Sequence, residues 1–213
     1  MTRYLVPTIA ALLLIAVSDA GAGVTKGRPL ETGQTTSYGE GTDGDLRPGL
    51  TRLFIDLNNG VVKDRRTGLF WEKKSNDGSI HDKDNVYGWA LSLPVPVVGE
   101  TFSGSVVSNF LANLNTPPCF AGFCDWRLPT FYELQTLVNI EKADLPAFAE
   151  FDTGCTPGCS VTQCSCTGSD FYWTSSTWRA VPTYAWVVYF STGSSSARMK
   201  TEGGYARAVR GGF

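Results

Sequence analysis

The first clear pattern of apolar and polar residues spans residues 53 to 71 and predicts antiparallel strands. Two β-prone runs, residues 53–57 and 61–64, flank Asn58-Asn59-Gly60, and an Asn-Gly pair between two such runs is typical of a β-hairpin. The apolar run at residues 68–71 follows closely and predicts the next strand. The pattern therefore indicates a meander of short strands.

The C-terminal third carries two further strand patterns. Residues 184–190 are apolar at odd and even positions alike, which indicates a strand covered on both faces. Residues 205–210 predict a last strand, which Gly211 and Gly212 end. A stretch rich in Ser and Gly, residues 191–196, lies between the two patterns.

Two segments between these strands have the periodicity of helices. In residues 105–114 the apolar side chains fall on one helical face, with Asn115, Pro117 and Pro118 ending the pattern. Thr130 and Glu133 have the spacing of a capping box and predict the start of a second helix. The apolar positions of the two helices are Val106, Val107, Phe110, Leu111 and Leu114 in the first, and Leu134, Leu137 and Val138 in the second.

The N-terminal segment has the pattern of a secretory signal peptide. Arg3 precedes an apolar run at residues 4–17, and small residues follow up to Ala22, where we expect cleavage. A retained membrane helix is the alternative, but the run is shorter than the ~20 apolar residues that a span needs. We predict a signal peptide at residues 1–22, a polar linker or arm at 23–52, and one exported domain at 53–213, in the periplasm or secreted.

The six cysteines predict three disulfides, because export leads to an oxidising compartment. Six cysteines can pair in many ways, so the sequence leaves the connectivity open. We favour a local Cys119–Cys124 pair and a nested arrangement in which Cys155–Cys166 encloses Cys159–Cys164. The alternative is a zinc site at the clustered cysteines 159, 164 and 166, which the export signal disfavours.

The formal net charge of -2 gives no general attraction to nucleic acid or to anionic membranes. We therefore predict no nucleic-acid partner and, after signal cleavage, no integral membrane segment. The C-terminal third is nevertheless biased toward basic residues, namely Arg198, Lys200, Arg207 and Arg210. Arg127 and Arg210 are expected to pair with acids such as Glu133 or Asp125 and to hold loops in place.

From residue 53 to 212 the chain resembles the C-terminal domain family of the Legionella collagen-like protein. The order of several strings along the chain carries the resemblance: Thr67-Gly68-Leu69-Phe70-Trp71-Glu72, the Trp89 region, Asp125-Trp126-Arg127-Leu128-Pro129-Thr130 with Glu133-Leu134, Tyr172-Trp173-Thr174-Ser175-Ser176, Ala185-Trp186-Val187-Val188-Tyr189-Phe190, and Val209-Arg210-Gly211-Gly212.

The resemblance implies an α+β fold of the C-type-lectin-like kind, shared distantly with formylglycine-generating (sulfatase-modifying) enzymes. Two helices would pack on small, twisted antiparallel sheets, with long loops and with termini close together. The chain departs from the family pattern at Ala208, where many relatives carry Cys, and residues 155–166 look like an insertion.

The sequence offers few residues for catalysis. His81 is the only histidine and lies in a polar loop beside Asp82 and Asp84, where we expect it to be exposed to solvent. Chemistry of the formylglycine-generating type needs reactive cysteines near the last strand, and no cysteine follows Cys166. We predict a non-catalytic domain; an enzyme of that type, or a hydrolase, is the alternative.

An acidic loop supplies the hard oxygen ligands that calcium prefers, with Asp77, Asp82 and Asp84 as its carboxylates. The loop lacks EF-hand spacing because Val86 stands where a ligand is needed and Tyr87 where the turn glycine belongs. Solvated loop acids are the favoured interpretation, so no cofactor is predicted.

Five of the six tryptophans lie in predicted regular elements and are assigned to the core: Trp71, Trp89, Trp126, Trp173 and Trp186. Trp178 differs, because it lies beside Arg179 in a loop that contains proline, near Tyr184. An indole beside a guanidinium suits stacking on a sugar and pairing with a carboxylate or sulfate, although a loop Trp that folds back onto its own domain is equally favoured.

If Arg179, Arg198 and Lys200 converge, they would form an anion-binding face for an acidic polysaccharide. We therefore predict an exported domain that binds a polysaccharide or another cell-surface ligand through loops 177–183 and 191–204. A structural protein of cell-surface assemblies is a third alternative, and the sequence does not indicate the oligomeric state.

Overall fold

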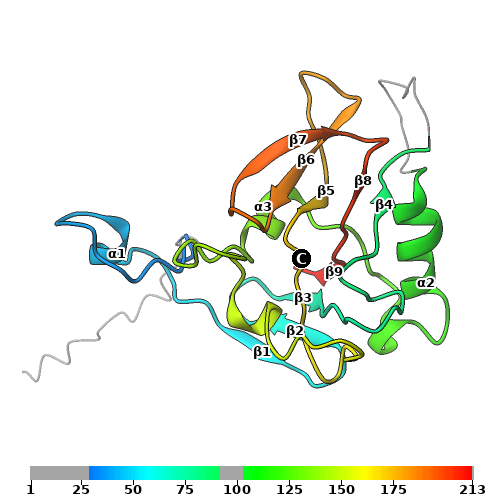
Figure 1. The fold of residues 1–213 in the computed structure, drawn as a ribbon, viewed down its shortest axis with the longest axis horizontal. Helices are drawn as coiled ribbons and strands as arrows, with labels where there is room; N and C mark the ends of the chain where they lie inside the picture. Colours follow the sequence, from blue (N-terminus) through cyan, green and yellow to red (C-terminus); the bar gives the residue numbers. More distant parts are fainter. Residues whose placement is uncertain (1–28, 92–102, 213) are drawn as a thin grey trace, which may run out of the picture.

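The computed structural model describes residues 29–91 and 103–212, and the predicted signal peptide lies outside this part (Figure 1). The described part contains nine short strands in three antiparallel sheets, together with short helices and long connections. The α+β prediction is confirmed.

The first sheet has the order β1-β2-β3-β9, so the first and last strands of the domain belong to one sheet. The predicted hairpin is present, with Asn58 and Gly60 at φ 57° and 90°, backbone conformations that Asn and Gly adopt readily. The expected third strand follows it. The strands are β1 (Phe54–Asp56), β2 (Val61–Asp64), β3 (Leu69–Glu72) and β9 (Val209–Gly211).

The second large sheet has the order β5-β6-β7, with β6 in the centre. Its members are β5 (Phe171–Thr177), β6 (Tyr184–Tyr189) and β7 (Ser195–Met199), and a third sheet pairs β4 (Tyr87–Gly88) with β8 (Gly203–Gly204). On β6, Val187 and Val188 are both fully buried although they point to opposite faces. The prediction that this strand is covered on both faces is confirmed.

The first predicted helix consists of a π-helical segment, η1 (Val106–Leu111), which continues into α2 (Ala112–Asn115). Its face toward the core buries Val106, Phe110 and Leu114, as the periodicity predicts. The second is α3 (Phe131–Gln135), and its capping box is complete. Three further short helices are α1 (Asp43–Leu46), η2 (Phe120–Gly122) and η3 (Ala149–Phe151).

The apolar core has two clusters, one on each face of the β5-β6-β7 sheet. The cluster that contains Val187 also holds Trp89, Trp126 and Trp173. The cluster that contains Val188 holds Trp71, Leu134 of α3, and Leu137 and Val138, which follow the end of that helix. The core assignment of Trp71, Trp89, Trp126 and Trp173 is therefore confirmed. Trp186 is only partly buried, because its side of β6 meets the surface at α3.

The predicted last strand is shorter than expected, because it begins at Val209 and not at Tyr205. Arg207 breaks the regular pairing: it is 1% exposed and its guanidinium donates to the backbone oxygens of Glu72 (3.1 Å) and Cys166 (2.6 Å). It also lies 5.2 Å from the ring of Phe151. The segment therefore crosses between the sheets and ties them together.

A buried carboxylate, Glu72, forms the centre of an ionic cluster beside Arg207. It accepts hydrogen bonds from the backbone N–H of Ala208 (2.9 Å) and from the ammonium of Lys74 (3.2 Å), and it contacts Nδ1 of His81 (2.7 Å). Burial alone would raise the pKa of Glu72, but these partners outweigh it and lower the pKa.

The expectation that His81 is a solvent-exposed loop residue was wrong. Its side chain is 14% exposed and its ring stacks on Phe120, with the centroids 4.2 Å apart. The contact with Glu72 explains the placement, because a buried carboxylate needs partners and the loop brings the imidazole to it.

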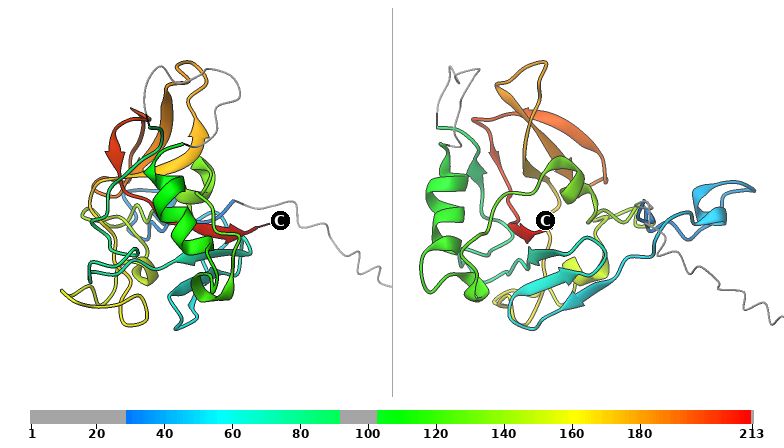
Figure 2. Two further views of the ribbon diagram at one scale, coloured as in Figure 1. Left: turned by 90° about the vertical axis from the view of Figure 1, so that its right-hand side faces the viewer. Right: turned by 180° about the vertical axis from the view of Figure 1, so that it is seen from behind.

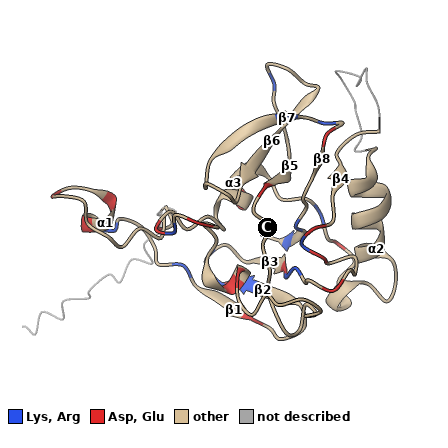
Figure 3. Cartoon of the chain, viewed as in Figure 1, with Lys and Arg blue, Asp and Glu red and all other residues tan. Residues whose placement is uncertain are grey.

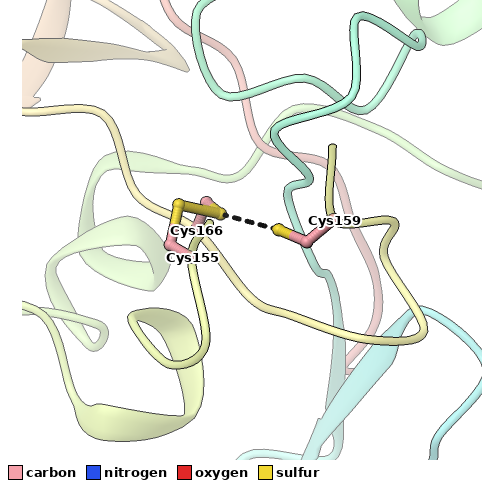
Figure 4. A group of neighbouring side chains, drawn as sticks. All are labelled: Cys155, Cys159 and Cys166. Atoms are coloured by element: carbon pink, nitrogen blue, oxygen red, sulfur yellow. Dashed lines mark hydrogen bonds between the residues drawn. A yellow bond between two sulfur atoms is a disulfide. The ribbon is translucent and has the colours of Figure 1, made fainter. Parts of the chain in front are cut away.

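The three disulfides have the pairing that we favoured, Cys119–Cys124, Cys155–Cys166 and Cys159–Cys164. Sγ of Cys159 lies 3.9 Å from Sγ of Cys166, and Figure 4 shows it pointing toward the neighbouring disulfide. Sγ atoms of Cys155, Cys159 and Cys166 lie within 4.8 Å of one another. The structure therefore places disulfides where the zinc alternative would place thiolates.

The polar arm before β1 is anchored to the domain by several contacts, which include the bond from Arg66 Nε to Thr51 O (2.8 Å). The Glu141 carboxylate accepts hydrogen bonds from the backbone N–H groups of Thr35 (2.7 Å) and Thr36 (3.0 Å), and Ile140 N donates to Thr32 O. Beyond this contact α1 projects away from the sheets, as Figures 1 and 2 show. Hydrogen bonds to Ile140 and Glu141 thus hold the part of the arm around residues 32–36.

Replacing the central carboxylate tests the ionic cluster. We expect Glu72→Ala to lower the free energy of unfolding by about 3–5 kcal/mol, because Lys74 and the N–H of Ala208 lose a buried partner. For a domain of this size this lowers the melting temperature by on the order of 10 °C. The exposed acid Glu40 provides a control, Glu40→Gln, and equal melting temperatures for both variants would contradict the account.

Candidate functional site

The loop between β5 and β6 carries two of the predicted site residues, Trp178 and Arg179, and a third, Tyr184, begins β6. The loop is closed by hydrogen bonds from Trp178 N to Tyr184 O (2.9 Å) and from Val181 N to Trp178 O (3.1 Å). Trp178 folds back onto its own domain, with its ring centroid 5.9 Å from Tyr184 and 6.4 Å from Trp186. Arg179 is exposed at the tip of the loop.

The Trp178 loop is one end of a continuous row of aromatic side chains, which we call the aromatic strip. From Trp186 the contacts continue to Phe131 (5.2 Å between centroids) and from Phe131 to Tyr132 (5.5 Å). Four of the rings are partly buried, and Tyr132 is 79% exposed. The strip consists of Tyr184, Trp178, Trp186, Phe131 and Tyr132.

Local structure explains why these rings lie on one surface. Tyr184 and Trp186 are two residues apart on β6, so they project from the same face of the sheet. Phe131 and Tyr132 occupy the first turn of α3, which the Thr130–Glu133 capping box starts at this point. In addition, Phe131 N donates to the hydroxyl of Ser176 on β5 (3.0 Å). A helix start and two neighbouring strands therefore assemble the strip.

The structure does not bring together the anion-binding face expected from Arg179, Arg198 and Lys200. Lys200 is 2% exposed, and its ammonium lies 3.9 Å from the centroid of the Trp89 ring. Arg198 is paired in register with the buried Ala185, so it points to the face opposite Trp186. The expectation that these two residues join Arg179 was wrong.

Arg198 also has partners of its own. Its guanidinium donates to the hydroxyl of Tyr189 (2.5 Å) and lies 3.5 Å from a carboxylate oxygen of Glu202. It stacks over the ring of Phe171 at 5.4 Å. The guanidinium of Arg198, which an anionic ligand would need, is therefore already engaged by side chains of the protein.

A pocket of about 230 Å³ adjoins the Tyr132 end of the strip. Its lining combines the ring of Tyr132 and the apolar side chain of Leu69 with polar groups. The full lining is Thr67, Leu69, Tyr132, Glu133, Thr136 and Gly212. Sequence reasoning did not find this pocket, because its residues come from three separate parts of the chain.

The carboxylate of this pocket is fixed by a bidentate ion pair. Arg127 donates to both oxygens of Glu133 (2.8 and 2.9 Å), and Thr130 N donates to Oε2 (2.7 Å). Burial by itself would raise the pKa of Glu133, but these hydrogen bonds outweigh it and lower the pKa. Arg210 likewise pairs with Asp125 (2.6 Å), so both predicted arginine pairings are confirmed.

The acids predicted as weak calcium ligands serve the geometry of their own loop. Asp82 is buried and accepts hydrogen bonds from Gly78 N (2.7 Å) and Asp84 N (2.9 Å), while Asp77 accepts from Ser75 Oγ (2.6 Å) and Ser79 N (3.0 Å). In the described part of the chain, these carboxylates do not form a group close enough to share an ion. The absence of a cofactor stays a prediction, with calcium at these acids as the weaker alternative.

Charged residues are sparse around the aromatic strip. Figure 3 shows that β5 and β6 carry no charged side chain, whereas charges are concentrated near β3 and β9. The charged residues next to the strip in sequence are Glu133, which is paired with Arg127, and the exposed Arg179. Among the described residues, no helix is long and apolar enough to cross a membrane.

These observations define a disulfide-stabilised α+β domain of small antiparallel sheets, with an aromatic strip and an adjoining pocket on its surface. The model of the Lcl C-terminal domain family matches residues 60–210, most of the chain, and the chain belongs to this family. Comparison with curated protein sequences gives no match.

The ion pair at the pocket predicts a loss of stability in acid. The pKa of Glu133 is lower in the folded than in the unfolded chain, so its contribution is present above its unfolded pKa and is lost as the pH falls through the folded one. We expect the free energy of unfolding to fall less steeply from pH 5 to pH 2 in Glu133→Gln than in the wild type. Equal slopes in denaturant titrations would contradict this assignment.

Proposed function

We propose that this domain is an exported, non-catalytic module that binds a polysaccharide or another glycan at the cell surface, and that the aromatic strip is its binding surface. The observation that carries the proposal is the strip itself: five adjoining rings, four partly buried and one exposed, supplied by α3, β6 and the Trp178 loop. Sugar rings present apolar C–H faces and polar rims, which suit stacking on amphipathic aromatic side chains.

The proposed export of the domain is supported by its disulfides and by the predicted signal peptide. Three disulfides are typical of proteins that mature outside the cytosol, and a domain stabilised by them tolerates an oxidising environment. The predicted signal peptide supports export on independent grounds. The C-type-lectin-like arrangement that the family resemblance implies is part of the same proposal, although fold alone does not define a ligand.

The non-catalytic part of the proposal rests on how the reactive side chains are occupied. The single histidine contacts the buried Glu72 and stacks on Phe120, away from the strip. All six cysteines are paired, so the described residues supply no free thiol for a nucleophile. An enzyme would therefore have to use other groups, such as a carboxylate that acts through water.

Glycan-binding measurements on the purified protein test the strip. We expect Trp178→Ala to weaken binding to a retained polysaccharide on the order of tenfold, since a central aromatic anchor is worth roughly 1.4 kcal/mol or more. The matched control is Tyr38→Ala, which removes a ring that is 77% exposed but lies on the arm. Affinity electrophoresis with a panel of soluble polysaccharides gives the readout.

The same panel identifies the outcomes that count against the proposal. No retention of the wild type by any polysaccharide would overturn glycan binding. Equal weakening by Trp178→Ala and Tyr38→Ala would remove the strip as the surface. Melting curves of both variants check that the fold is intact. We expect it to be intact in Trp178→Ala because Trp178 lies outside the two core clusters.

A further inference from the structure

The pocket next to Tyr132 has an unusual distribution of hydrogen-bonding groups. Four of its side chains are polar. Thr67, Glu133 and Thr136 each form internal hydrogen bonds that determine what they can offer to a ligand, whereas the exposed hydroxyl of Tyr132 can donate or accept. A hydroxyl contributes one proton and two lone pairs, whereas an ionised carboxylate contributes lone pairs alone. Counting donors and acceptors therefore indicates the ligand chemistry.

Both threonine protons are already used inside the protein. Thr136 Oγ1 donates to the backbone oxygen of Glu133 (2.6 Å), and Thr67 Oγ1 donates to Oδ2 of Asp64 (2.7 Å). Thr67 Oγ1 also accepts from Leu69 N at 3.3 Å, which leaves it one lone pair. Each hydroxyl can thus serve a ligand as an acceptor.

The carboxylate adds a third acceptor. Glu133 Oε2 receives two hydrogen bonds, from Arg127 and Thr130 N, but Oε1 receives only the one from Arg127. The ion pair keeps Glu133 ionised, so it cannot donate. The side-chain oxygens of Thr67, Glu133 and Thr136 are therefore all acceptors toward a ligand.

We propose that this pocket is a sugar subsite at the end of the aromatic strip, and that it takes an uncharged sugar ring through the hydroxyl protons of that ring. The inference rests on the proposed function and sharpens its ligand class. Sulfate and carboxylate groups are acceptors without protons at neutral pH. They face three acceptor oxygens, one of them charged, against one side-chain donor of the lining, the hydroxyl of Tyr132, so the pocket disfavours them.

Size and shape agree with a single ring. Pockets for drug-sized ligands hold about 300–1,000 Å³, so a volume of about 230 Å³ suits one small unit of a chain. Tyr132 lines the pocket and also contacts Phe131 edge-on, so a sugar in the pocket would adjoin sugars on the strip. The buried Leu69 provides an apolar contact for the ring.

The test compares polymers that share a backbone and differ in charge, using the full chain: hydroxyethyl cellulose with carboxymethyl cellulose, and dextran with dextran sulfate. We expect the wild type to bind a neutral polymer at least threefold more tightly than its anionic counterpart. Thr136→Val removes one acceptor with little change of volume, and we expect it to weaken neutral binding about threefold to tenfold, the effect of one hydrogen bond.

Thr116→Val is the matched control. Its hydroxyl donates to Ala112 O at 2.7 Å at the end of α2, so the substitution removes the same kind of hydroxyl-to-carbonyl bond away from the pocket. We expect it to leave binding unchanged. Thr67→Val is a second pocket variant, should Thr136→Val fail to fold.

The outcomes separate the subsite from the strip. Tighter binding of the anionic polymer, or unchanged neutral binding in Thr136→Val and Thr67→Val, overturns the subsite even where Trp178→Ala still weakens binding. Absence of binding by the wild type to all four polymers overturns both proposals. A neutral preference that Thr136→Val reduces and Thr116→Val preserves supports the subsite.

Discussion

The buried carboxylate of Glu72 is the interaction on which the rest of the structure depends. It joins the end of β3 to Ala208, which leads into β9, and to the loop that carries His81. Arg207, beside it, extends the cluster to the backbone of Cys166 and so to the nested disulfides. A charge in this position is costly unless every partner is present, so the cluster selects one arrangement of the sheets.

The same logic of paired charge positions the candidate site. Arg127 lies next to β9, where it bridges to Val209, and its ion pair with Glu133 fixes the first turn of α3. That turn presents Phe131 and Tyr132 to the strip and Glu133 to the pocket. The Arg-Leu-Pro-Thr string, which directly precedes Phe131, and the closing strand thus determine where the rings of the strip lie.

Local patterns predicted the elements well because hairpin, capping box and amphipathic helix are set by neighbours in the chain. The pairing of the arginines 127 and 210 followed from charge alone. The positions of Lys200 and His81 were not predicted, because the ammonium over Trp89 and the imidazole against Phe120 depend on residues distant in the sequence. Trp178 was singled out by its loop context, whereas Phe131 and Tyr132 joined the strip only through the tertiary packing of α3 on β6.

Indole N–H resonances give the most direct test that the strip is the ligand surface. Trp89, Trp126 and Trp173 donate internally to Thr174 O, Phe120 O and Tyr87 O, so their signals should stay in place when a polysaccharide is added. The signals of Trp178 and Trp186 should move with saturation. Shifts confined to the internally bonded indoles, or binding without movement of either strip indole, would contradict the account.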